Sequence, residues 1–120
     1  MSNPIKIINP IVKSVNFPNG QQLLQQVQTQ IQESPTVVVL LDCTEISFVD
    51  SAGLAALVRI AKETQRKGIR FCLCGVKNQM ATLLRLTAME GVFETFTNVA
   101  DFCNTLEPEF PQAIAALRMR

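Results

Sequence analysis

Two stretches decide the fold, Val37-Val38-Val39-Leu40-Leu41-Asp42 and Phe48-Val49-Asp50-Ser51-Ala52-Gly53-Leu54. The first holds five consecutive apolar residues, three of them valine, which predicts a central strand that is covered on both faces. The second turns sharply at Asp50-Ser51, and from Ala52 onward the apolar residues follow helical spacing. The face of this helix that packs on the strand at residues 37–41 is predicted to consist of Leu54, Leu57, Val58 and Ala61.

Ser51 is therefore expected in the turn ahead of a helix N-terminus, where free backbone N–H groups and the helix dipole favour an anion. A helix cap made by Asp50 or Ser51 explains one of these two residues. Gly53 in the first turn costs about 1 kcal/mol relative to alanine, and a residue this small lets another molecule approach the backbone closely. A structural cap and an exposed functional serine are both open interpretations at this point.

Length and composition predict one globular domain. The 120 residues are 48% hydrophobic and 18% charged, with a net charge of +1. Such a balance gives no support for nucleic-acid binding, which requires a clustered basic face. The apolar runs are too short to cross a membrane, and residues 1–6 do not resemble a signal peptide. We therefore expect a cytoplasmic protein that binds neither nucleic acid nor membrane.

The residue types that catalysis and metal binding usually require are sparse. The chain contains no histidine, so Ser51 lacks the commonest general base, and the motif Gly-x-Ser-x-Gly is absent. Neither glycine-rich nucleotide loop occurs. We predict no catalytic residue, no cofactor and no metal site, and hence a protein that is not an enzyme. The four cysteines are expected to be reduced and buried, with two of them on the same face of one strand: Cys43, Cys72, Cys74 and Cys103.

Around this centre, strands alternate with single amphipathic helices, which predicts an α/β domain with a parallel core. Two N-terminal strands would make the sheet mixed, with about five strands and four to five helices packed against it. The predicted strands are 5–8, 11–15, 37–41, 69–74 and 92–96, and the predicted helices are 21–34, 52–67, 77–90 and 98–106, with a loop at 17–20. Residues 1–107 are expected to form the domain. Residues 108–120 are expected to be an accessory C-terminal tail, with room for one short helix around Ile114 and Leu117.

The segment at residues 46–57, Ile-Ser-Phe-Val-Asp-Ser-Ala-Gly-Leu-Ala-Ala-Leu, resembles the signature of the STAS domain, and in particular that of the bacterial anti-sigma factor antagonists. The strand at 37–42 and the segments 67–75 and 83–93 fit the same family, so the resemblance extends over about residues 37–106. Two features differ from the usual pattern. Ala52 stands where serine or threonine is common, and the early loop at residues 14–19 carries no acidic residue.

The resemblance implies a STAS domain that acts in signal transduction and transcription regulation by partner switching. The unmodified domain would bind a GHKL-type serine kinase that is also an anti-sigma factor. Phosphorylation of the serine directly after the motif aspartate, here Ser51, would dissociate the complex, and a serine phosphatase would reset it. The partner-binding residues would be Asp50, Ser51, Ala52, Gly53 and Leu54. The alternative is a STAS scaffold that binds a protein or small ligand without phosphorylation, outside a sigma-factor pathway.

Overall fold

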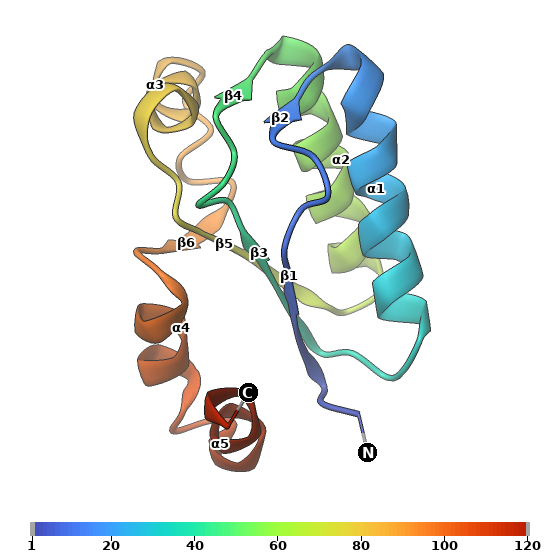
Figure 1. The fold of residues 1–120 in the computed structure, drawn as a ribbon, viewed down its shortest axis with the longest axis vertical. Coiled ribbons are helices and arrows are strands. Elements are labelled where there is room, and N and C mark those ends of the chain that lie inside the picture. The colour runs from blue at the N-terminus through green and yellow to red at the C-terminus, as the bar shows by residue number, and fades with distance from the viewer. Residues whose placement is uncertain (1, 120) are drawn as a thin grey trace.

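A computed structural model describes residues 2–119, which form six strands and five helices in one α/β domain (Figure 1). The strands are β1 (Ile5–Ile8), β2 (Ser14–Val15), β3 (Val38–Asp42), β4 (Phe48–Val49), β5 (Arg70–Cys74) and β6 (Glu94–Phe96). The helices are α1 (Phe17–Gln32), α2 (Ser51–Arg66), α3 (Asn78–Leu86), α4 (Val99–Leu106) and α5 (Pro111–Arg118). The single α/β domain predicted from the sequence is confirmed.

The main sheet has four strands in the order β1-β3-β5-β6, and every pairing in it is parallel. The expectation of a mixed sheet was wrong. After Asn9-Pro10 the chain leaves the main sheet, and β2 pairs instead with β4 in a separate parallel sheet of two strands. Because each strand of the main sheet returns through a helical crossover, all four strands run in one direction.

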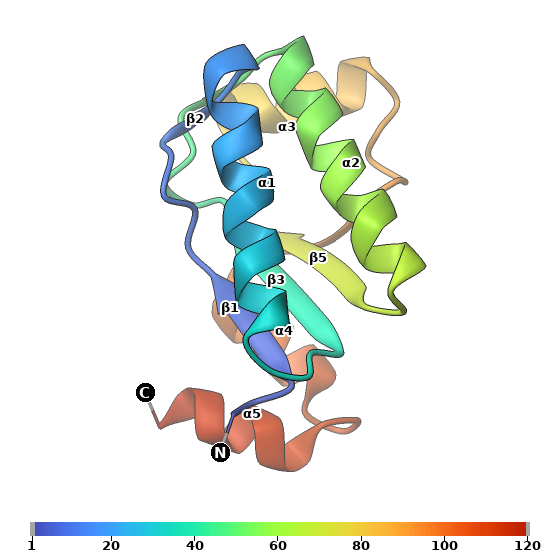
Figure 2. The same cartoon turned by 90° about the vertical axis from the view of Figure 1, so that its right-hand side faces the viewer.

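The central strand β3 is covered on both faces, as its unbroken apolar run predicts. Val39 and Leu41 belong to a first core with α1, α2 and α3, whereas Val38 and Leu40 belong to a second core with α4 and α5. Figures 1 and 2 show α1 and α2 on one side of the strands and α4 on the other, with α5 at the lower end of the molecule. In α2 the predicted inward residues do contact the first core, since Leu54 and Leu57 are buried in it and Val58 and Ala61 pack against it.

Helix α1 begins four residues earlier than predicted. Residues 17–20 were expected to be a loop, but they form the first turn of the helix. The side chain of Asn16 caps this turn by accepting a hydrogen bond from the backbone N–H of Asn19, and Pro18 occupies a position in the first turn that needs no backbone donor. Gly20 lies at the contact between α1 and α2, where an added Cβ would be 2.9 Å from that of Ala56.

In the C-terminal part of the chain, one helix is shorter than predicted. Helix α3 ends at Leu86 rather than near residue 90, because the chain turns at Ala88, which has a φ of 58°. Thr87 and Ala88, at this turn, are both exposed. Helix α5 forms within the predicted tail, and its Ile114 is fully buried in the second core. Whether residues 1–107 fold without this helix is a question that truncation of the chain would answer.

Candidate functional site

Ser51 is the first residue of α2, and its neighbour Asp50 makes the cap. The Asp50 carboxylate Oδ1 accepts a hydrogen bond of 2.7 Å from the backbone N–H of Gly53, and the Asp50 carbonyl accepts one of 2.8 Å from Leu54. The capping role that either residue could have filled thus belongs to Asp50. The side chain of Ser51 is exposed at the helix N-terminus. Its hydroxyl is consequently not needed to begin the helix.

Gly53 has a structural role that differs from the one the sequence suggested. A Cβ built on Gly53 would lie 1.9 Å from the carbonyl oxygen of Val15 and 3.1 Å from the backbone nitrogen of Asn16. The small residue therefore allows the junction of β2 and α1 to approach α2, and Gly53 is buried by its own chain. The close approach is made within the domain rather than by another molecule.

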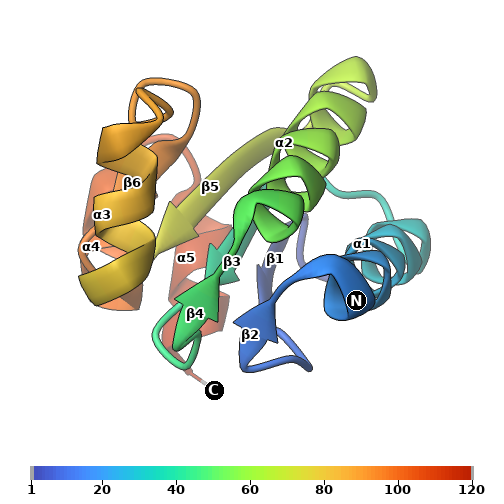
Figure 3. The ribbon, with the colours of Figure 1, turned by 90° about the horizontal axis from the view of Figure 1, so that it is seen from above.

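This junction brings the starts of two helices side by side. The backbone N–H of Asp50 donates a hydrogen bond of 3.1 Å to the carbonyl of Val15, directly before the cap residue of α1, Asn16. Seen from above, β2 and β4 lie next to each other and lead into α1 and α2 (Figure 3). The early loop at residues 14–19, which contains no acidic residue, is thus a direct neighbour of the Ser51 turn. The residue of this loop that caps α1, Asn16, is uncharged.

The surface around Ser51 combines apolar side chains with two cationic ones, Arg59 and Lys62. Phe17, at the start of α1, has 83% of its surface exposed, and Phe48, in β4, has 46%. A shallow groove of about 500 Å³ follows α2 on the side of Met89, and it is lined by Ser51, Leu54, Ala55, Val58, Arg59, Lys62 and Met89. Phe17 could not be recognised from the sequence as a neighbour of α2, because residues 17–20 were expected to be a loop and instead form the first turn of α1.

The five predicted partner-binding residues are not equally accessible. Ser51 is exposed, Asp50 and Ala52 are half-buried, and Gly53 and Leu54 are buried. A partner approaching this end of α2 would meet Ser51 and Ala52 directly. Gly53 and Leu54 would contribute by holding the helix against β2 and against the first core.

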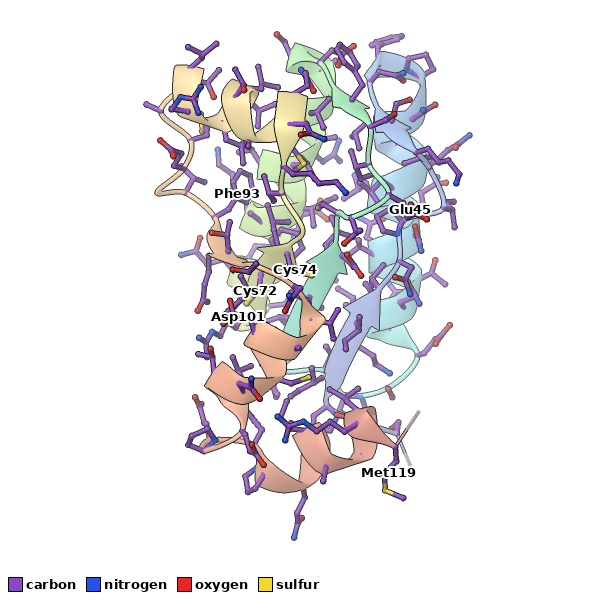
Figure 4. The ribbon with its side chains drawn as sticks, turned by 60° about the vertical axis from the view of Figure 1, so that its left-hand side comes forward. Glu45, Cys72, Cys74, Phe93, Asp101 and Met119 are labelled. Carbon is purple, nitrogen blue, oxygen red and sulfur yellow. The ribbon has the colours of Figure 1, made fainter. Side chains whose placement is uncertain are left out.

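The four cysteines are buried free thiols, as predicted. Cys72 and Cys74 point to the same face of β5 and pack in the second core, as Figure 4 shows beside α4. Burial raises the pKa of Cys43, of Cys72 and of Cys74 to about 12. These thiols are therefore protonated at neutral pH, and a protonated thiol is a poor nucleophile and a poor metal ligand.

Within residues 2–119, none of the helices is both long enough and apolar enough for a membrane crossing. Comparison with known proteins gives a consistent assignment of the fold. The sequence model of the STAS domain matches residues 3–102.

Three solved structures are similar to the chain at low sequence identity. The first is a sulfate transporter family protein from Wolinella succinogenes, with a TM-score of 0.69, 20% identity and coverage of 82% of this chain and 80% of that one. The second is a putative anti-sigma factor antagonist from Thermotoga maritima, with a TM-score of 0.70 and 15% identity, and the match covers 84% of this chain and 87% of that one. The third is the murine anion transporter Slc26a9, with a TM-score of 0.72 and 20% identity. That match covers 83% of this chain and 17% of the transporter. At these identities the likeness concerns the fold alone.

Proposed function

The chain belongs to the STAS domain family, and from that premise we propose that it is a regulatory protein-binding domain whose binding is switched by phosphorylation of Ser51. The observation that carries this function is that Asp50 and Ser51, which are neighbours at the start of α2, have different roles. Asp50 makes the helix cap, while the neighbouring Ser51 side chain is exposed. A serine that is dispensable for the cap and accessible from solvent is suited to modification by another protein. The domain itself would be a substrate and a binding partner, not an enzyme.

The physical effect of a phosphate at Ser51 would be local. A phosphoserine adds a charge of about −1.5 to −2 at neutral pH. The dipole of α2 and the N–H groups of its first turn that Asp50 does not bind would stabilise this anion, so the fold would not need to rearrange. Two apolar side chains are exposed in this region, since Phe17 lines a groove together with Ala52 and Phe48 precedes Ser51 by three residues. A partner that covers an uncharged serine beside such side chains would lose affinity when it has to desolvate a phosphate.

The partners that fit this switch are a GHKL-type serine kinase that also serves as an anti-sigma factor, and a serine phosphatase. Support comes from the family membership and from the structural likeness to the putative anti-sigma factor antagonist of Thermotoga maritima. The domain would bind the kinase in its unmodified form and release it once phosphorylated. We also propose a cytoplasmic location, and the buried free thiols support it because they fit a reducing compartment.

Mass spectrometry of the protein purified from its native host tests this function directly. We expect a phosphopeptide that carries the phosphate on Ser51 and disappears in the Ser51→Ala variant. Ser47 provides a control, since it is exposed four residues earlier but its hydroxyl donates a hydrogen bond to the carbonyl of Lys13, and Ser47→Ala should leave the phosphate on Ser51 in place. Phosphate that is absent from Ser51 in growing, stressed and stationary cells alike would contradict the switch.

A second function is favoured by two specific observations. The fold is also similar to that of a sulfate transporter family protein, and the early loop beside Ser51 has no acidic residue. The corresponding candidate is an unphosphorylated STAS scaffold that binds a protein or small ligand, with Phe17 and Phe48 as apolar contacts. Under this alternative, a negative charge placed at position 51 would leave the biological partner bound.

A further inference from the structure

Strand β4, which leads into the Ser51 turn, is paired on one side by a strand and on the other by a side chain. Its pairing strand is β2. On the opposite side, the backbone N–H of Val49 donates a hydrogen bond of 2.8 Å to Oε1 of Gln79, and Nε2 of Gln79 donates one of 2.7 Å to the carbonyl oxygen of Val49. Gln79 belongs to α3 and is thirty positions away in sequence. One side chain thus completes the hydrogen bonding of Val49.

The geometry explains why a glutamine occupies this position. Val49 is fully buried, so water could not easily replace a lost partner of its backbone groups. A carboxamide presents one acceptor and one donor side by side, which is the pattern that a neighbouring strand would offer. Only one orientation of the amide satisfies both hydrogen bonds. Lysine would lack the acceptor, an ionised glutamate would lack the donor, and an asparagine at the same backbone position would be one methylene shorter.

The two hydrogen bonds connect the turn to the interior of the domain. Helix α3 packs more extensively against β4 than against any other described element. Its Met80 and Leu84 are buried in the first core, which fixes the helix that carries Gln79. Val49 is followed directly by Asp50, whose backbone N–H is bound to Val15 and whose carboxylate caps α2. The residues before Ser51 are therefore held from two sides, by β2 and by α3.

We propose that Gln79 is a positioning residue for Ser51, in that it holds β4 and the following turn in the geometry in which Ser51 is presented to its partner. This role rests on the function proposed above for Ser51. The hydrogen bonds of Gln79, however, belong to the unmodified domain. Their effect on the turn can therefore be measured without a kinase, a phosphatase or a phosphate.

Hydrogen exchange of the backbone amides in the purified full chain is the direct test. In Gln79→Ala the amide of Val49 loses its acceptor, and we expect its protection factor to fall by about tenfold or more, with a smaller loss at Asp50. The amides of Leu57 and Ile60, in the middle of α2, should keep their protection. Thr82→Ala is the matched control, because Thr82 is exposed on the same helix and its substitution should change none of these values.

A conservative variant separates positioning from packing. In Gln79→Glu at pH 7, the carboxylate can still accept a hydrogen bond from the N–H of Val49. It has no proton to donate to the carbonyl oxygen of Val49, so the second hydrogen bond is lost. The protonated carboxyl offers the same acceptor and donor as the native amide. Position 79 is half-buried, and this partial burial and the second hydrogen bond both favour the neutral carboxyl and raise the pKa of Glu at this position. Protection of Val49 should therefore return as the pH is lowered from about 7 to about 5. Wild type measured at the same pH values corrects for the pH dependence of exchange itself.

Two results would overturn the inference. One is unchanged protection of Val49 and Asp50 in Gln79→Ala. The other is an equal loss of protection throughout the chain together with no recovery of Gln79→Glu at low pH, which would reduce Gln79 to general stabilisation. If Gln79→Ala does not fold, the pH series of Gln79→Glu decides alone.

The functional consequence is measured separately, as the fraction of Ser51 that carries phosphate in the native host. Gln79→Ala should lower this fraction relative to Thr82→Ala at equal protein levels. If wild type carries no phosphate on Ser51, the proposed switch fails, while the exchange data still decide whether Gln79 holds the turn. If the exchange data support positioning but phosphorylation of Gln79→Ala equals that of wild type, the presentation of Ser51 does not depend on Gln79 and the inference fails.

Discussion

The two faces of the four-stranded sheet are both closed by helices, but only one of them leads to the candidate site. On the first face, α1 and α2 are sixteen residues long and begin together at the end of the molecule where β2 and β4 lie. On the second face, α4 and α5 have eight residues each. Both layers bury fully inaccessible side chains. The difference shows that burial alone does not make a site, since the first face adds two adjacent helix N-termini and an exposed serine.

The largest expected effect tests whether the second face is as necessary to the fold as the first. Ile114→Ala should lower the free energy of unfolding by about 2–5 kcal/mol, because Ile114 is fully buried in the second core. Leu57→Ala should cost a similar amount on the first face, where Leu57 is buried by α2. Chemical denaturation followed by circular dichroism measures both.

Met119→Ala is the control for this comparison, since Met119 directly follows α5 but is 87% exposed (Figure 4). Its unfolding midpoint should equal that of wild type. If the unfolding midpoint of Ile114→Ala also equals that of wild type, the result would support the expectation that residues 108–120 are an accessory tail.

A smaller effect is expected at the close contact between Gly53 of α2 and Val15 of β2, which lies on the first face. In Gly53→Ala the added Cβ would lie 1.9 Å from the carbonyl oxygen of Val15. Either α2 or the junction of β2 and α1 therefore has to move. Overpacking of this kind typically costs about 1–3 kcal/mol. Gly91→Ala is the matched control, because nothing lies within 4 Å of an added Cβ there. Equal unfolding midpoints for the two variants would show that α2 does not depend on this close approach.

The first face was also the more predictable one. The valine-rich run before Asp42 could be recognised as a two-sided strand, because its apolar residues are continuous rather than alternating. The start of α2 could be placed within one residue, since Asp and Ser are common at helix N-termini. The remaining ambiguity was which of Asp50 and Ser51 makes the cap. That depends on backbone geometry, which a sequence pattern does not contain.

Contacts between distant segments account for most of what could not be predicted. Ile114 and Leu117 follow two prolines and a short polar stretch, and nothing in that pattern shows that they reach Ile5 and Val38 across the second core. Gln79 looks like any polar residue on the outer face of a helix, because its partner is a backbone group thirty positions earlier. Likewise, the role of Gly53 depends on Val15, which the sequence places in a different strand.

A still smaller effect concerns an ion pair on the second face. Arg70 in β5 binds the Glu94 carboxylate in β6 through two nitrogens, and this hydrogen bonding holds the pKa of Glu94 below its ordinary value. A carboxylate with a depressed pKa stabilises the folded state above its unfolded pKa, and this contribution disappears as the pH falls through the folded pKa. Because both side chains are partly exposed, we expect Glu94→Gln to cost about 0.5–1 kcal/mol at pH 7.

The same difference should shrink toward zero as the pH is lowered from about 5 to about 3, because wild type then loses the contribution that Glu94→Gln never had. Glu45→Gln, at an exposed position on the loop after β3, serves as the control (Figure 4). Urea denaturation at four or five pH values provides the measurement. A difference between wild type and Glu94→Gln that stays constant over this range would mean that the ion pair does not contribute through its charge.

The smallest effect on stability is expected at Ser51, where the effect on binding should be greatest. Because Asp50 makes the cap, Ser51→Ala should leave the free energy of unfolding within about 1 kcal/mol of wild type. Ser51→Asp places a negative charge in the first turn of α2, where an acidic group contributes about 0.3–1 kcal/mol of stabilisation. Both variants should therefore melt close to wild type. Ser51→Ala should retain the protein partner that co-purifies with wild type from the native host, and Ser51→Asp should lose it. Retention of that partner by Ser51→Asp would contradict the phosphorylation switch and favour the unphosphorylated scaffold, since a charge at position 51 would then have entered the interface without consequence.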